Sequence, residues 1–81
     1  PHIYATLRAA ARRTHELAPA ELEAWVCREI ESNPLLKVIY FQAVDARTMQ
    51  RVATWDECPR IQGCVAVQAG SVRLIDNIKL R

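Results

Sequence analysis

Three cysteines carry the most reactive side chains of the chain, and their spacing limits the chemistry that they could perform. Cys27, Cys58 and Cys64 lack the close pairing typical of zinc sites, and the two histidines, His2 and His15, are distant from them. An odd number of cysteines without a framework spacing favours a reducing compartment, so we expect free thiols in a cytoplasmic protein. Cys27 is interpreted as a half-buried thiol rather than a nucleophile.

Acid–base catalysis would need two carboxyl groups at one place. The candidates in the less regular parts of the chain are Asp45, Asp56, Glu57 and Asp76, and nothing in their spacing brings two of them together. The sequence also lacks a glycine-rich phosphate loop and a serine elbow motif. We therefore predict no catalytic residue, no cofactor-binding residue and no metal ligand within this chain.

A basic stripe is the remaining candidate for binding chemistry. Arg8, Arg12 and Arg13 lie near one another in the first predicted helix, and they are the basis of an alternative interpretation as a small RNA-binding α+β domain. The net charge of +2 is too small for the concentrated basic face that nucleic acid requires. No apolar run is long enough to span a membrane and no secretory leader opens the chain, so we expect neither a nucleic-acid nor a membrane partner.

Length and composition indicate one small globular domain. The chain has 81 residues, of which 51% are hydrophobic and 25% charged. A domain of this size buries only about 60–65% of the surface of its unfolded chain, so its stability is expected to be modest.

Two helices are predicted in the first part of the chain. Residues 2–15 carry one apolar stripe at helical spacing. It consists of Ile3, Tyr4, Leu7, Ala10 and Ala11. A second helix should begin at Pro19, which suits a first helical turn, and should end at Asn33, because Pro34 follows. Its apolar face is formed by Leu22, Trp25, Val26 and Ile30. A short connection predicts that the helices pack antiparallel.

The first predicted strand, residues 35–44, is apolar on both faces. Strict alternation assigns Leu36, Val38, Tyr40 and Val44 to one face and Ile39, Phe41 and Ala43 to the other. A strand of this kind should be covered on both sides. Two helices can cover one face, so the other face predicts a partner that the chain does not contain.

Residues 45–62 connect this strand to a hairpin. Residues 45–50 predict a tight turn in which Asp45 accepts from the backbone near Thr48. Residues 51–62 have no period, and we expect a loop whose Trp55 folds back over apolar surface.

The hairpin is predicted from two apolar runs, residues 64–69 and 72–75, on either side of Gly70 and Ser71. Gly-X suits a two-residue type II′ turn, because glycine adopts a positive φ without a Cβ clash. A bulge or turn is expected at Asp76 and Asn77, after which Ile78 and Leu80 return to the core.

Residues 70–78, with the sequence GSVRLIDNI, resemble the signature near the carboxyl end of pantoate–β-alanine ligases, the pantothenate synthetases. Residues 40–49, YFQAVDARTM, resemble the aromatic-led strand of the same family that ends in Asp-x-x-Thr-Leu, with Met49 in place of the leucine. The spacing between the two segments also fits. The resemblance extends over most of the chain but only over the small C-terminal domain of that family.

This resemblance implies a lid domain of α+β class, with two N-terminal helices followed by a three-stranded antiparallel sheet, strand two in the centre. Residues 1–81 would form the single C-terminal domain, and the N-terminal Rossmann-like catalytic domain would lie outside this chain. The full-length enzyme would condense pantoate and β-alanine with ATP and magnesium through a pantoyl adenylate, whereas this part alone would be inactive.

The partner implied is therefore the catalytic domain of the same enzyme, and the isolated domain is expected to self-associate. A freestanding protein-interaction module that has lost its catalytic domain is the main alternative.

Overall fold

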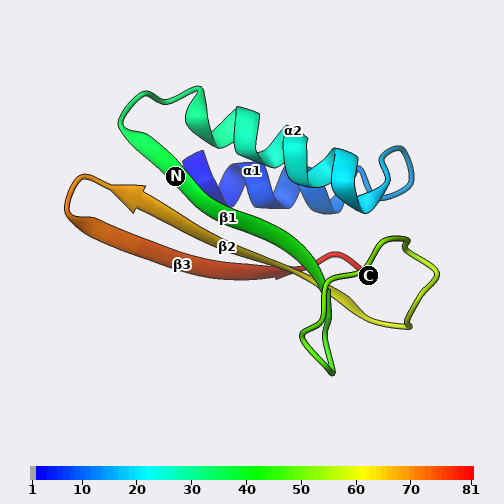
Figure 1. Cartoon of the computed structure of the whole chain (residues 1–81). Coiled ribbons are helices and arrows are strands. Elements are labelled where there is room, and N and C mark those ends of the chain that lie inside the picture. The colour runs from blue at the N-terminus through cyan, green and yellow to red at the C-terminus, as the bar shows by residue number, and fades with distance from the viewer. Residues whose placement is uncertain (1) are drawn as a thin grey trace.

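The computed structural model describes residues 2–81, so Pro1 of the predicted domain lies outside the described residues. Two helices lie on one face of a three-stranded sheet (Figure 1). The elements in chain order are α1 (His2–Ala11), α2 (Pro19–Glu31), β1 (Leu36–Asp45), β2 (Ile61–Ala69) and β3 (Val72–Lys79). All neighbouring strands are antiparallel, and β2 lies between β1 and β3. The predicted fold class and the central position of the second strand are confirmed.

Helix α1 is shorter than predicted. Leu7 and Ala10 are fully buried as expected, but Tyr4, which was assigned to the apolar stripe, is half exposed. The helix ends at Ala11 because the N–H of Arg13 donates to the Ala10 carbonyl at 2.9 Å, which tightens the last turn. The chain can then reverse direction toward α2.

Helix α2 begins with Pro19 at its first turn, as predicted. The Glu21 carboxylate accepts the N–H of Ala18 at 2.8 Å, which holds the residue that precedes the helix. Leu22, Val26 and Ile30 are fully buried, and Trp25 is partly buried against the same core. The spacing of these residues therefore identifies the packed face of the helix correctly.

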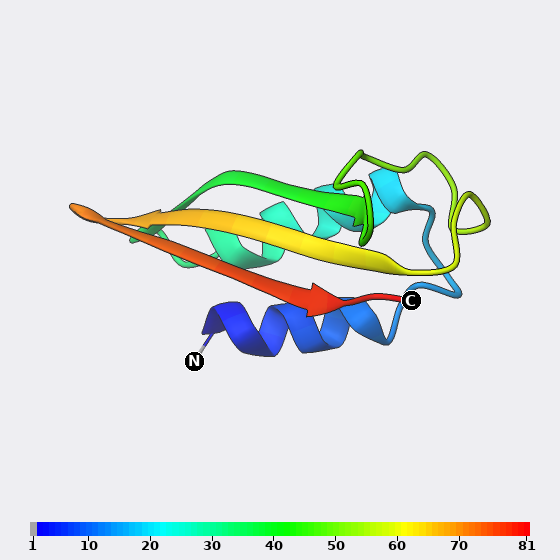
Figure 2. The same ribbon diagram turned by 90° about the horizontal axis from the view of Figure 1, so that it is seen from below.

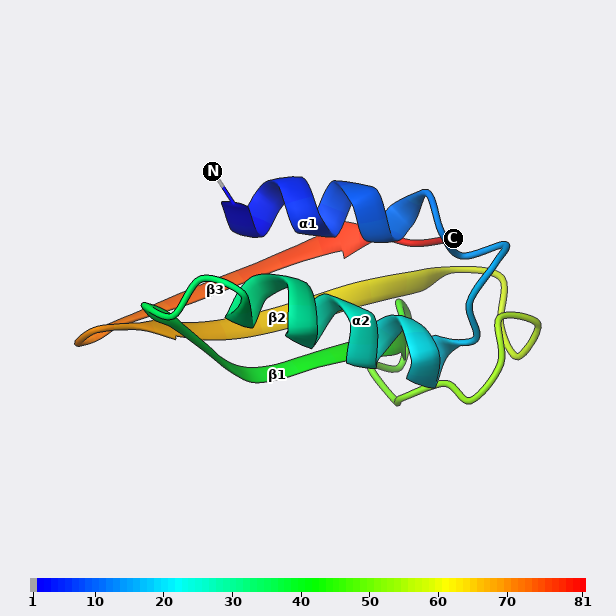
Figure 3. The same ribbon diagram turned by 90° about the horizontal axis from the view of Figure 1, so that it is seen from above.

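The two helices run antiparallel to each other above the sheet, as Figure 3 shows from that side. Their free ends are joined where His2 Nε2 lies 2.8 Å from the carbonyl oxygen of Glu29. The hydrophobic core lies between the helices and the sheet. Its members come from every element except β3, and Val52 and Leu80 join it from segments outside the helices and strands. They are Leu7, Ala10, Leu22, Val26, Ile30, Phe41, Ala43, Val52, Ile61, Val65, Val67 and Leu80.

The predicted two-sided pattern of β1 is wrong, because a bulge changes the alternation. The register with β2 shifts between Val38 and Tyr40, so Ile39 is an extra residue in the strand. Leu36 and Val38 consequently share the helix-covered face with Phe41 and Ala43 and pack on the same core. The helix-free face of this strand is left with Tyr40, Gln42 and Val44.

The hairpin between β2 and β3 is formed as predicted. Ala69 pairs with Val72 across Gly70 and Ser71, and Gly70 has φ +62°. The bulge or turn expected at Asp76 and Asn77 is wrong, because the register continues unbroken to Lys79. The two polar side chains make bonds that leave the ladder intact: Asp76 Oδ1 accepts the N–H of Asn77, and Asn77 Oδ1 accepts from Gln62 on β2.

Residues 46–60 form a long excursion at one end of the sheet (Figures 1 and 2). Asp45 Oδ1 accepts the N–H of Arg47 at 2.8 Å, which confirms the turn predicted at Asp45. Met49 closes this turn with φ +64°, its N–H donating to the Asp45 carbonyl. Trp55 then folds back against the core, as expected.

Candidate functional site

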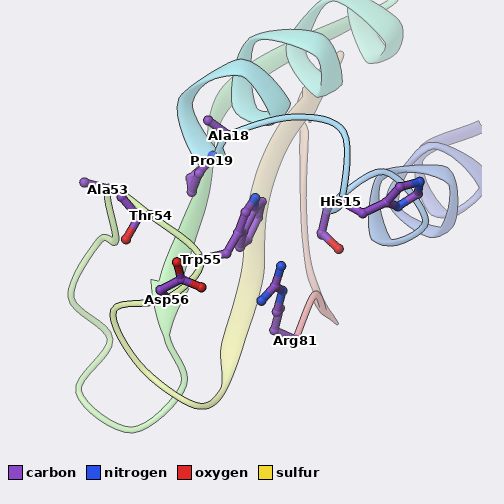
Figure 4. A pocket seen from close by; sticks show the side chains of 9 residues that line it. His15, Ala18, Pro19, Ala53, Thr54, Trp55, Asp56 and Arg81 are labelled. Atoms are coloured by element: carbon purple, nitrogen blue, oxygen red, sulfur yellow. The ribbon is translucent and has the colours of Figure 1, made fainter.

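A cleft of about 290 Å³ surrounds Trp55 at the end of the sheet where the excursion lies (Figure 4). The indole Nε1 donates to the Leu17 carbonyl at 2.7 Å, and the Arg81 guanidinium lies 5.8 Å from the ring centroid. Its lining residues are Thr14, His15, Ala18, Pro19, Ala53, Thr54, Trp55, Asp56 and Arg81. Trp55 therefore joins the helix connector to Arg81, and the cleft is lined by one histidine, His15, and one carboxylate, Asp56.

A second cleft, of about 610 Å³, lies between the turn after β1 and the loop before β2. It is lined by Asp45, Ala46, Arg47, Glu57, Cys58, Pro59 and Arg60. Two of the sequence-predicted carboxyl candidates, Asp45 and Glu57, are thus brought to one place. Asp56 lines the cleft around Trp55 instead, and Asp76 lies on β3.

Both carboxylates of this second cleft hold loop backbone. Glu57 Oε1 accepts the N–H groups of Ala53 and Thr54. The backbone N–H of Arg47 lowers the pKa of Asp45, with a smaller lowering from the nearby Cys58 thiol. Each carboxyl group therefore has a structural role in holding the loop backbone.

Cys58 lies beside Asp45, a juxtaposition that no motif in the sequence signals. Its thiol donates to the Arg60 carbonyl at 3.4 Å. Partial burial and the negative charge of Asp45 raise the pKa of Cys58, so the thiol stays protonated at neutral pH. A protonated thiol is a poor nucleophile.

The other two cysteines are on separate elements, Cys27 on α2 and Cys64 on β2, and all three are free thiols. Burial raises the pKa of Cys27, with a further contribution from Glu31 and Glu23, and burial also raises the pKa of Cys64. Within residues 2–81, no group of three or more His, Cys, Asp and Glu side chains is placed to hold a metal ion.

The arginines proposed for RNA binding are partly engaged within the chain. Arg13 forms an ion pair with Glu16 at 3.0 Å and lies over the Trp25 ring, 5.0 Å from its centroid. Arg8 lies over the ring of Tyr4. These contacts divide the predicted basic stripe between different neighbours. In the part of the chain that the structure describes, no helix is long and apolar enough to cross a membrane.

The sheet face opposite the helices, which we call the open face, carries no helix (Figure 1). Pairing places Tyr40, Ala66 and Ile75 in one row across it, one residue from each strand. Ile75 is 68% exposed and Tyr40 38%. The next row toward the hairpin turn is Lys37, Gln68 and Arg73. Tyrosine and arginine, which this face exposes in Tyr40 and Arg73, are enriched in protein interfaces.

Comparison with known proteins gives one consistent result. The sequence profile described as pantoate-beta-alanine ligase matches residues 1–79. The pantothenate synthetase of Bacteroides thetaiotaomicron is 42% identical over 62 residues, which are 76% of this chain and 22% of that protein. The pantothenate synthetase of Azobacteroides pseudotrichonymphae is 38% identical over 76 residues, 94% of this chain and 27% of that protein.

The fold of this chain also matches part of a solved structure. The crystal structure of pantothenate synthetase from Thermus thermophilus superposes with a TM-score of 0.84 at 23% identity, covering 99% of this chain and 29% of that one. The chain thus spans between about a fifth and a third of the length of the proteins it matches.

Proposed function

Because this chain belongs to the pantoate–β-alanine ligase family, we propose that it is the C-terminal lid domain of a cytoplasmic pantothenate synthetase. The observation that supports this proposal is that nearly the whole chain superposes on a small part of a much longer pantothenate synthetase. The family signature therefore lies in a unit that folds as two helices on a sheet, while the larger part of such an enzyme lies outside these residues.

In the proposed full-length enzyme, pantoate is joined to β-alanine at the expense of ATP through a pantoyl adenylate. ATP and magnesium supply the activation of the pantoate carboxyl group and the neutralisation of phosphate charge. The larger of the two clefts described above does not suit a metal ion, since both of its carboxylates already accept hydrogen bonds from loop backbone. Nucleotide, metal and catalytic residues are therefore proposed to lie in the N-terminal Rossmann-like domain.

The contribution proposed for this chain is to close over the reacting groups. A lid excludes water, which would otherwise hydrolyse a reactive acyl adenylate. Docking would use the open face, since the helices already cover the opposite face of the sheet (Figure 1). In an intact enzyme this contact would also stabilise the domain by mass action.

The test compares the full-length reading frame with the 81-residue chain. Each is incubated with ATP, Mg²⁺, pantoate and β-alanine, and AMP and pantothenate are both measured. We expect the full-length protein to form the two products in equal amounts and the chain alone to form neither. AMP release by the chain alone, or micromolar ATP binding to it by calorimetry, would overturn the lid assignment. A reading frame without a catalytic domain would favour a freestanding interaction module instead.

A further inference from the structure

The two edge strands of the sheet, β1 and β3, differ in whether their outward backbone N–H groups are hydrogen-bonded. On β1 the outward N–H of Val38 donates to Glu31 at 2.8 Å, and that of Ala43 donates to Glu23 at 2.9 Å. Glu23 is itself fixed by Arg51, whose Nη2 lies 2.6 Å from the carboxylate. Two carboxylates of α2 thus occupy backbone donors that an added strand would need, so this edge is closed.

The β3 edge is open. A two-residue hairpin turn closes on a hydrogen-bonded pair, here Ala69 and Val72, so alternate residues of β3 direct their N–H and C=O groups away from β2. These residues are Arg73, Ile75, Asn77 and Lys79. The outward N–H of Asn77 donates to Asp76 Oδ1 at 2.8 Å. Within residues 2–81, the outward N–H groups of Arg73, Ile75 and Lys79 have no hydrogen-bond acceptor.

Several side chains at this edge are exposed to solvent. Val72 and Leu74 are about half exposed and Ile75 is 68% exposed. Across the described part of the chain, Arg73 takes part in no ion pair. The family-like run therefore coincides with the most exposed strand of the molecule, and the packing of this domain does not explain its apolar and charged residues.

We propose that the outer edge of β3 receives an extended segment of the full-length ligase from outside these 81 residues. The segment would pair with the outward backbone groups of Arg73 and Ile75, place an apolar side chain against Ile75 and bring a carboxylate to Arg73. This inference rests on the proposed function and specifies where the lid domain is held by the rest of the enzyme.

Two observations favour this occupant over a second copy of the chain. α1 runs beside β3 in the same direction (Figures 2 and 3), so residues that precede α1 in a longer chain would emerge on this side of the sheet. A second copy would bring another Arg73 and Lys79 to the same edge and face, whereas an acidic segment complements their charge.

Residue-resolved hydrogen exchange tests the proposal. We expect the N–H groups of Arg73 and Ile75 to exchange about tenfold or more slowly in the full-length protein than in the 81-residue chain. The N–H groups of Val38 and Ala43 serve as internal controls, because their acceptors on α2 are present in both proteins.

Charge reversal at the two ends of the row formed by Lys37, Gln68 and Arg73 provides a pair of matched variants. Arg73→Glu at the β3 end should remove much of the protection of the Ile75 N–H in the full-length protein, while Lys37→Glu at the β1 end should leave it unchanged. Ile75→Pro removes the outward donor and the exposed Ile75 side chain but no hydrogen bond to β2, so the isolated variant should lose little in melting temperature while the full-length variant releases AMP in excess of pantothenate.

Each outcome decides between distinct conclusions. Fast exchange at β3 in a full-length protein that makes pantothenate would overturn the edge-pairing inference and leave the proposed function intact. Arg73 and Lys79 would then only protect an exposed edge from aggregation. Protection at β3 in a full-length protein without ligase activity would overturn the proposed function alone. Protection that rises with concentration in the 81-residue chain would identify a second copy as the occupant and refute the proposed segment.

Discussion

The ring of Phe41 lies directly over Gly63, on the helix-covered face of the sheet. A Cβ atom at Gly63 would lie 2.9 Å from Phe41 Cζ and 3.2 Å from Leu80 Cδ1. Phe41 is buried, so its ring has little room to move. Gly63 is therefore required for the close approach of a side chain rather than for an unusual backbone angle.

Gly63→Ala should consequently destabilise the domain by about 1–3 kcal/mol through overpacking. The free energy of unfolding is measured by urea titration followed by circular dichroism. Phe41→Leu combined with Gly63→Ala should cost less than the sum of the two single substitutions, because the smaller side chain relieves the contact. Additive losses would show that the ring does not limit the space at residue 63.

Gly70, in contrast to Gly63, is required for its backbone angle rather than for space. Nothing lies within 4 Å of a Cβ placed there, but its φ is +62°. Gly70→Val should destabilise by roughly 1–3 kcal/mol, because a β-branched residue adopts this backbone region only with strain. Ser71→Ala, at the adjacent turn position, should change stability by less than about 0.5 kcal/mol. Equal losses in the two urea titrations would contradict the type II′ turn.

Asp45 should make stability depend on pH. Its pKa in the folded chain is below the ordinary value of 3.8, chiefly because the N–H of Arg47 donates to it. Stabilisation by the carboxylate is therefore present above the unfolded-state pKa and is lost as the pH falls through the folded-state pKa. Asp45→Ala should be less stable than the parent at neutral pH, and this difference should shrink at about pH 3.

Asp45→Asn is the matched variant, because it keeps an oxygen acceptor for the Arg47 N–H and loses only the charge. Its stability should lie between those of the parent and Asp45→Ala. A difference between parent and Asp45→Ala that stays constant from neutral to acidic pH would show that the charge of Asp45 contributes nothing.

Periodicity, together with turn and proline signals, was sufficient to predict the order of the elements and the buried face of α2, and the short connection was sufficient to predict the antiparallel helices. It failed in β1, where Ile39 is inserted as a bulge and the apolar positions change parity after Val38. The sequence is compatible with the bulge, since Leu36 and Val38 fall on the same face as Phe41 and Ala43 once a single extra residue is inserted between the two pairs. Choosing that insertion required the pairing partners on β2, which a strand's own sequence does not contain.

The loop contacts could not be predicted for a related reason. Cys58 meets Asp45, and Glu23 meets Ala43 and Arg51, across separations set by the tertiary fold. The end of α1 was missed because residues 12–17 form a tight reversal in place of a further helical turn. The reversal brings the Leu17 carbonyl to the Trp55 indole N–H, a tertiary contact that local propensity does not contain.

Trp55 provides the last prediction, because its contribution can be divided into a hydrogen bond and an apolar contact. Trp55→Phe removes the donor to the Leu17 carbonyl and should destabilise by about 1 kcal/mol. Trp55→Ala also uncovers the core and should destabilise by roughly 2 kcal/mol or more, below the value for a fully buried ring. Far-ultraviolet circular dichroism is the suitable probe, since each variant also removes a fluorophore.

Trp25→Phe is the control for these two variants. Trp25 is also partly buried on the core, and within residues 2–81 its indole nitrogen has no hydrogen-bond partner. The substitution should therefore destabilise less than Trp55→Phe. If the two Trp→Phe variants unfold at the same urea concentration, the bond to Leu17 does not hold the loop, and packing alone keeps Trp55 in place.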